Sequence, residues 1–109
     1  MTFDEYQKLA LRTAITTGKK NELFHLVLGL VGESGEIAEK VKKLIRDHDS
    51  NEDMIDRDDI AKELGDVLWY IAVLSSHLGI TLEDIADKNV KKLTSRFERG
   101  QIKGSGDNR

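Results

Sequence analysis

The chain has 109 residues, which is enough for one domain. Its 17 lysine and arginine residues and 20 aspartate and glutamate residues give a net charge of −3, and the sequence lacks the block of basic residues that is typical of nucleic-acid-binding proteins. The absence of cysteine excludes a disulfide framework, thiolate metal sites and a cysteine nucleophile, while no apolar run approaches the ~20 residues of a membrane span and no signal-peptide pattern opens the chain. With no proline, 34% charged and 6% aromatic residues, the composition predicts a soluble, cytoplasmic, mostly helical domain whose partners are neither nucleic-acid polymers nor membranes.

Apolar periodicity and end signals predict four helices, at residues 3–17, 22–46, 57–78 and 82–99. The first begins with a capping box formed by Thr2 and Glu5. The fourth begins after Thr81 and stops at Gly100. The polar stretch 47–56 interrupts the periodicity and is predicted to be a loop.

These helices place one domain at residues 1–100. The remaining segment, 101–109, is rich in glycine and its last six residues lack apolar side chains. We therefore expect it to be a mobile C-terminal tail unless something binds it.

The two central predicted helices carry apolar residues on two sides. Their main stripes follow the helical period and contain Leu26, Leu30, Ile37, Val41 and Leu44 in one helix and Ile60, Val67, Ile71, Leu74 and Leu78 in the other. The opposite sides contain Leu28, Val31 and Ala38, and Ala61, Trp69 and Ala72. A chain of this size cannot cover both sides of both helices. We therefore expect a homo-oligomer, at least a dimer, packed through the central helices.

Four acidic residues interrupt this apolar pattern. Glu33 and Glu63 fall only about 40° from the centres of their stripes, and Glu36 and Asp66 follow three residues later at the stripe edges. Four carboxylates in a partly buried groove would repel each other and lose hydration, so a cation should neutralise them. Oxygen ligands without cysteine or suitably spaced histidine favour Mg²⁺, with Mn²⁺ as a possible substitute. A salt-bridge cluster that includes Lys40 is the alternative.

Polar residues on the fourth predicted helix would suit phosphate oxygens. Asn89 interrupts the apolar stripe of that helix, and Lys92 and Arg96 follow on the same side. Taken alone, a solvated helix flank explains these residues equally well. Acids on two helices together with cations on a third make phosphate–metal chemistry the hypothesis that accounts for both groups.

In this order the motifs resemble the all-α nucleoside triphosphate pyrophosphohydrolases of the MazG-like group. Glu33-x-x-Glu36 resembles the first acidic motif of that family, and Glu63-x-x-Asp66 within KELGDVLWYIAVL resembles the second. The segment NVKKLTSRFERG resembles the family's Asn-x-x-Lys-Leu segment. The opening FDEYQKLALRTA and the closing GSGDNR extend the resemblance over nearly the whole chain.

The resemblance implies an all-α bundle of four or five helices that oligomerises through its central helices as a dimer or a dimer of dimers. It implies a cytoplasmic house-cleaning enzyme of nucleotide metabolism, which cleaves (deoxy)nucleoside triphosphates between the α and β phosphates. The products would be a nucleoside monophosphate and pyrophosphate. The four acids, Glu33, Glu36, Glu63 and Asp66, would hold one or more Mg²⁺ ions.

The resemblance also suggests catalytic and substrate-binding roles. An acid, or a water molecule activated by the metal, would provide the nucleophile. We take Glu36 as the candidate general base and name Glu33 as a second candidate catalytic residue. Asn89, Lys92 and Arg96 would bind substrate, and Lys92 would also counter charge on the leaving pyrophosphate.

Two aromatic residues follow the second acidic motif. Tyr70 shares the acidic face, where it could contact substrate or form the floor of the groove. Trp69 points away from the acids, which favours interface packing over base stacking.

Three other interpretations remain. A phosphoribosyl-nucleotide pyrophosphohydrolase of the same superfamily would use the same acids. A non-catalytic helical adaptor would use them as an ion-pair cluster and would not depend on metal. A di-iron carboxylate bundle is weaker, because it needs two Glu-x-x-His motifs and the chain has only Glu22-x-x-His25.

Overall fold

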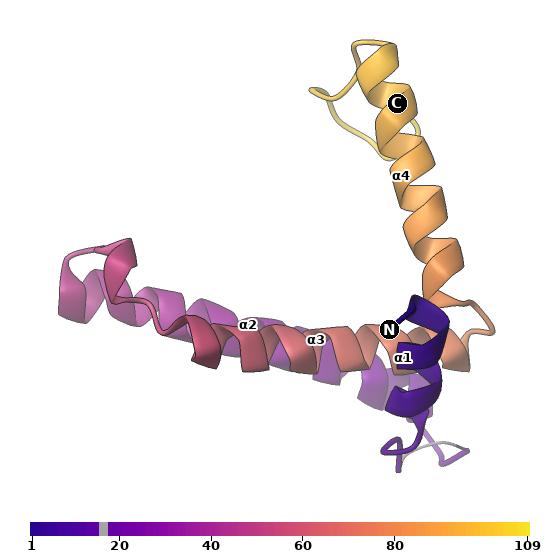
Figure 1. The fold of residues 1–109 in the computed structure, drawn as a ribbon, viewed down its shortest axis with the longest axis horizontal. Helices are drawn as coiled ribbons and strands as arrows, with labels where there is room; N and C mark the ends of the chain where they lie inside the picture. Colours follow the sequence, from indigo (N-terminus) through magenta and orange to yellow (C-terminus); the bar gives the residue numbers. More distant parts are fainter. Residues whose placement is uncertain (16–17) are drawn as a thin grey trace.

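The computed structural model describes residues 1–15 and 18–109, which form four α-helices, one short 3₁₀ turn and connecting loops. In chain order these are α1 (Phe3–Leu11), α2 (Glu22–His48), η1 (Glu52–Met54), α3 (Arg57–His77) and α4 (Leu82–Glu98). No strand occurs in the described part of the chain, so the prediction of an all-α fold is confirmed. Figure 1 shows α2 and α3 side by side as an antiparallel pair, α1 against one end of the pair, and α4 extending away from it.

The predicted helix boundaries hold within two residues except at the end of the first helix. That helix begins at the predicted capping box, in which the Thr2 hydroxyl accepts from the Glu5 amide at 3.1 Å. It ends at Leu11 and not at residue 17, although residues 16–17 themselves lie outside the described part. Beyond Leu11 the backbone continues with i→i+3 hydrogen bonds, in which the Thr13 and Ala14 amides donate to the Ala10 and Leu11 carbonyls at 3.2 Å each. The Ala10 carbonyl also accepts from the Thr13 hydroxyl and from the Trp69 indole, each at 3.1 Å.

The hydrophobic core lies where α1 crosses the α2–α3 pair. Its buried members are Ala10, Leu26, Ala72, Val73 and Leu82. The polar side chain of Gln7 of α1 is also buried. Its amide nitrogen donates to the carbonyls of Ala72 and Ile80 at 3.1 Å each, and its oxygen accepts from the Leu82 amide at 3.2 Å. This amide therefore joins α1 to the end of α3 and to the start of α4.

The second apolar sides of the two central helices differ in how far they are buried. On α3, Ala72 is fully buried, and Trp69 packs against the core and donates to α1. The indole therefore packs within its own chain, whereas the sequence had suggested an interface with another chain. On α2, by contrast, Leu28 and Val31 remain 70% and 65% exposed.

The four helices do not close into a bundle within one chain. The axes of α3 and α4 are bent by 102°, and among the described residues α4 contacts α1 and α3 but not α2 (Figure 1). The radius of gyration is 17.0 Å, whereas a compact domain of this length has about 13 Å. The accessible surface is 8225 Å², against about 6100 Å² for a typical monomer of this mass.

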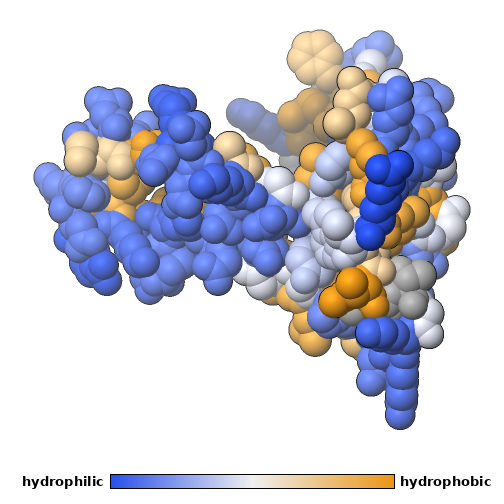
Figure 2. All heavy atoms as spheres, turned by 60° about the horizontal axis from the view of Figure 1, so that its bottom comes forward, coloured by the Kyte–Doolittle hydropathy of each residue, from blue (hydrophilic) through white to orange (hydrophobic). Residues whose placement is uncertain are grey.

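The surplus surface is partly hydrophobic. Figure 2 shows that the loop end of the α2–α3 pair is largely hydrophilic, whereas hydrophobic surface gathers around the end at which α1 and α4 join it. No single helix among the described residues is long and apolar enough to cross a membrane. In the part of the chain that the structure describes, only α3 and α4 taken together reach that length and composition, and they do so across their bend.

Candidate functional site

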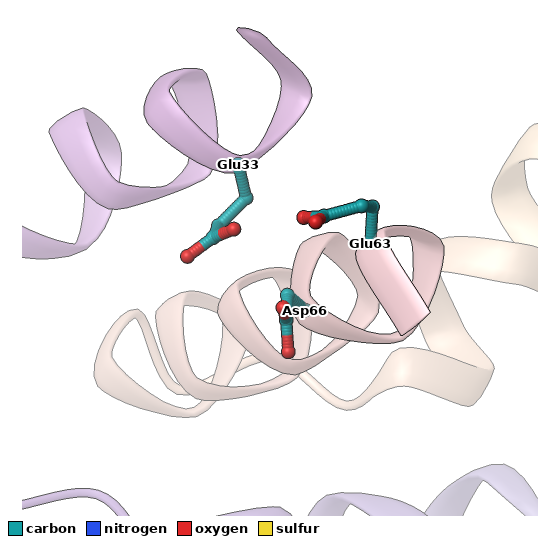
Figure 3. Close-up of side chains that lie close together, drawn as sticks. All are labelled: Glu33, Glu63 and Asp66. Carbon is teal, nitrogen blue, oxygen red and sulfur yellow. The ribbon is translucent and has the colours of Figure 1, made fainter. Parts of the chain in front are cut away.

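Three of the predicted metal ligands meet between α2 and α3. Because the two helices are antiparallel, Glu33 on α2 faces Glu63 and Asp66, which lie one turn apart on α3. Figure 3 shows Glu33 pointing toward α3 and Glu63 pointing back toward it, with Asp66 further along α3. Each residue offers a carboxylate oxygen that lies within 4.8 Å of the other two. Glu33 and Glu63 are half-buried, and Asp66 is exposed.

The cluster carries more negative charge than the chain neutralises. Lys40, one turn after Glu36 on α2, forms ion pairs with Glu63, at 3.2 Å, and with Asp59. Within the described residues no ion pair reaches Glu33 or Asp66. The pKa of Glu33 is raised, first by burial and then by the charge of Asp66 and the other two acids, Glu63 and Glu36.

This arrangement fits a hard divalent cation. The donors are three carboxylates on two rigid helices, close enough to share one ion, and Mg²⁺, Mn²⁺ and Ca²⁺ all prefer such oxygen ligands. The salt-bridge alternative holds for Glu63, which Lys40 contacts. It does not account for Glu33, which forms no ion pair within the described residues and whose pKa is raised by burial and by the neighbouring acids.

Glu36 lies outside this three-residue cluster. It follows Glu33 by almost one turn of α2 and borders an open hollow of about 380 Å³ between the second half of α2, η1 and the start of α3. Charged residues form part of the hollow, including Lys40, Lys43 and Asp59. Its apolar lining consists of Leu44, Met54, Ile55 and Ile60. The hollow thus adjoins the acids and offers both charged and apolar contacts.

Two tyrosines come close to the acidic region. Tyr70 packs against α2 at Gly29, where an added Cβ would lie 2.2 Å from the tyrosine Cε1, so only glycine permits this approach. Its ring also meets the Trp69 ring edge-on, with centroids 4.9 Å apart. Tyr6 of α1 was not identified from the sequence: burial and the charge of Asp66 raise its pKa. Sixty residues separate Tyr6 from Asp66, and no spacing rule links them.

The proposed substrate-binding residues of α4 do not reach the acids of their own chain. Asn89 is exposed, and α4 leaves the α2–α3 pair (Figure 1). Lys92 and Arg96 instead form ion pairs with Asp107 in the C-terminal segment, at 2.8 and 3.1 Å. Hydrogen bonds from these two cations lower the pKa of Asp107.

Comparison with known protein families identifies the family of this chain. Residues 22–100 match the family of the MazG nucleotide pyrophosphohydrolase domain. This match spans α2, α3 and α4, and it includes all four acids and the cations of α4. The chain therefore belongs to the MazG nucleotide pyrophosphohydrolase family.

Two relatives extend this comparison. Gene 37 protein of Mycobacterium phage L5 is 47% identical over 114 residues, which cover the whole of both chains. Uncharacterized protein YvdC of Bacillus subtilis (strain 168) is 34% identical over 74 residues, which cover 63% of this chain and 70% of the relative. Neither name specifies an activity. No solved structure gives a significant match.

Proposed function

We propose that this protein is a magnesium-dependent pyrophosphohydrolase that cleaves nucleoside or deoxynucleoside triphosphates between the α and β phosphates. The products are a nucleoside monophosphate and pyrophosphate. The observation that carries the proposal is the convergence of Glu33, Glu63 and Asp66, from two helices, to within 4.8 Å. These residues occupy the acidic motifs of a chain that belongs to the pyrophosphohydrolase family.

In this proposal Glu33, Glu63 and Asp66 hold Mg²⁺, for which Mn²⁺ can substitute. When bound, the ion supplies positive charge for phosphate oxygens and lowers the pKa of water. Glu36 is the candidate general base, because it borders the hollow beside the cluster and is not one of the three clustered acids. It takes a proton from the water that attacks the α-phosphorus, and pyrophosphate leaves with the bridging oxygen.

We also propose that the active unit is a homodimer or a dimer of dimers. The chain exposes about 2100 Å² more surface than a typical monomer of its mass. Two chains together have about 4200 Å² of such surplus surface, which falls in the range that obligate homodimers bury. Large apolar side chains are exposed on the helices that would meet, including Phe24 and Leu28 on α2 and Val90 and Phe97 on α4. Because α4 leaves its own acids, a second copy is the source from which Asn89, Lys92 and Arg96 would reach a substrate phosphate.

Product analysis tests the activity directly. The protein is incubated with Mg²⁺ and a panel of ribo- and deoxynucleoside triphosphates, and monophosphate and pyrophosphate are separated from diphosphate and phosphate. Monophosphate with pyrophosphate, lost in the presence of a chelator, is the expected result. Diphosphate with phosphate would refute the proposed bond cleavage.

Two variants sharpen this test. Asp66→Asn removes one of the clustered acids and should abolish turnover while the helical content is kept. Asp58→Asn is the matched control, because Asp58 is an exposed acid two turns earlier on α3. Equal turnover in both variants would contradict the metal assignment.

The outcome without products also separates the alternatives. Stabilisation by Mg²⁺ without hydrolysis of any nucleoside triphosphate would favour a phosphoribosyl-nucleotide substrate. Neither hydrolysis nor stabilisation would favour the helical adaptor, in which Lys40 and the acids form a structural ion-pair cluster.

A further inference from the structure

The C-terminal segment 101–109 folds back along α4 (Figure 1), and contacts of Arg109 close it into a loop. The Arg109 guanidinium donates to three carbonyls of the segment, those of Gln101, Ile102 and Gly106, at 3.1, 2.9 and 2.7 Å. Arg99 of the α4 cap donates to the Arg109 carbonyl at 2.7 Å. The segment therefore forms a closed loop that is held against α4.

Asp107 is the contact between this loop and the cations of α4. One carboxylate oxygen, Oδ1, accepts from Lys92 Nζ at 2.8 Å and from Arg96 Nη2 at 3.1 Å, and Arg96 also donates to the Asp107 carbonyl. The Arg96 side chain is only 6% exposed, whereas the Asp107 side chain is 80% exposed. The loop therefore covers Arg96, while the acid that pairs with it remains in contact with water.

We propose that Asp107 occupies the position of a substrate phosphate on Lys92 and Arg96, and that the loop 101–109 must release these cations before a polyphosphate can bind them. This inference rests on the proposed function for the identity of the ligand, the polyphosphate chain of a nucleotide. The loop is then an intramolecular competitor: it keeps a buried arginine paired until an anion of higher charge arrives.

The chemistry of the contact supports an exchange of this kind. A carboxylate and a phosphate oxygen make the same charge-assisted hydrogen bonds to lysine and arginine. A triphosphate brings several negative charges and many acceptor oxygens to two cations that now share a single carboxylate oxygen of Asp107. The side chains of Lys92 and Asp107 are 38% and 80% exposed, and ion pairs between solvent-exposed groups are weak.

The backbone of the loop is also suited to reorganisation. Gly104 and Gly106 have φ angles of 140° and 86°, which other residues rarely adopt, and they flank the turn that returns Asp107 to α4. Apart from Ile102, the loop contains no large apolar side chain. It is thus held by polar contacts, which a competing anion can replace.

The first experiment measures anion binding without catalysis. Inorganic triphosphate is titrated by calorimetry into the wild-type protein, Asp107→Asn and Asp87→Asn, all in a buffer with a chelator and without Mg²⁺. Asp87 pairs with Lys91 on the exposed side of the same helix at 2.8 Å, so its variant makes the same change in net charge. We expect Asp107→Asn to bind triphosphate three- to tenfold more tightly than Asp87→Asn does. Equal affinities, or weaker binding by Asp107→Asn, would overturn the inference.

The second experiment follows the carboxylate itself in the wild-type protein. The pKa of Asp107 is measured by carbon NMR of its side chain, with and without triphosphate. It should be below the ordinary aspartate value in the free protein and should return toward that value when triphosphate displaces the carboxylate. An unchanged pKa at saturating triphosphate would show that the loop stays closed.

Neither readout needs turnover, so the two proposals fail separately. Hydrolysis of nucleotides with a loop that stays closed would refute the competitor role alone. Release of the loop by triphosphate without any hydrolysis would refute the proposed activity and leave the anion-responsive loop in place.

Discussion

Replacing Glu33 by glutamine should stabilise the metal-free protein and abolish its response to Mg²⁺. Glu33 lies half-buried between α2 and α3, beside Glu63 and Asp66, and no ion pair neutralises it within the described residues. Glutamine keeps the size of the side chain and removes the charge. Without metal, the substitution therefore relieves the repulsion between Glu33 and the neighbouring carboxylates. With metal, it removes one of the carboxylate ligands.

The magnitude follows from the separation of the carboxylates. Two unit charges at the 4.8 Å limit of the cluster repel each other by about 0.9 kcal/mol in water and by about 3.5 kcal/mol at an effective dielectric constant near 20. Lys40 compensates Glu63, which leaves Asp66 as the main uncompensated neighbour. Because Asp66 is exposed to water, we expect a gain near the lower limit, about 1 kcal/mol. For a domain of this size that gain raises the melting temperature by about 4–8 °C.

The pH dependence has a defined sign. Because the pKa of Glu33 is raised in the folded protein, the folded state holds this proton more tightly than the unfolded state does. The wild-type protein therefore loses stability as the pH rises from the ordinary glutamate pKa through the raised value. The stability gained in Glu33→Gln should accordingly be absent at acidic pH and complete above that window.

Glu39→Gln is the matched control. Glu39 lies on the same helix, but a hydrogen bond from Lys42 lowers its pKa, so its charge favours folding and is lost as the pH falls. This variant should not raise the melting temperature, and it should keep the Mg²⁺ response. Thermal unfolding of the three proteins, with Mg²⁺ and with a chelator, measures both effects. A lower melting temperature of Glu33→Gln in chelator, or an Mg²⁺ shift equal to that of the wild type, would refute the reasoning.

Two further substitutions test the packing that supports the site. Gly29→Ala places a Cβ 2.2 Å from Tyr70. The overpacking cost of about 1–3 kcal/mol should exceed the helix-propensity gain of about 1 kcal/mol, so this variant should have a lower free energy of unfolding in chemical denaturation. Gly35→Ala, where the added Cβ has no atom within 4 Å, should have a higher one. If both variants were stabilised, the close approach at Gly29 would be wrong. Gln7→Leu leaves two buried backbone groups, the Ala72 carbonyl and the Leu82 amide, without the partner that Gln7 provides, together with the partly buried Ile80 carbonyl. It should cost about 2 kcal/mol or more, and a loss below half of that value would refute the role of Gln7 in joining α1 to α3 and α4.

Local features of the fold followed directly from the sequence. The caps at Thr2 and Thr81 act as predicted, because each depends on residues within one helical turn. The face shared by Glu63 and Asp66 is likewise a consequence of the helical period. Their encounter with Glu33 needed only the further step that two helices joined by a short loop pack antiparallel.

Long-range features could not be obtained in this way. Where the first helix ends, its Ala10 carbonyl accepts a hydrogen bond from Trp69, which lies 59 residues away. The buried amide of Gln7 bonds to groups 65 to 75 residues away, and nothing in its own segment indicates this. The direction of α4, and hence its separation from the acids, likewise depends on contacts between distant segments. Periodicity assigns a residue to a face of a helix, but it does not identify the element against which that face packs.

The uneven burial along the α2–α3 pair has a consequence for how the two helices separate. At one end Leu26, Ala72 and Val73 are buried beneath α1, whereas toward the loop end of the described chain the buried apolar side chains are reduced to Leu44, which is 9% exposed. Regions with few buried apolar contacts open first, so we expect local separation of α2 from α3 to begin near the loop that joins them. The acids lie between the fixed end and the opening end, and the width of the gap between them therefore varies with that motion. A metal ion bound by acids of both α2 and α3 would hold the distance between the two helices constant at this point.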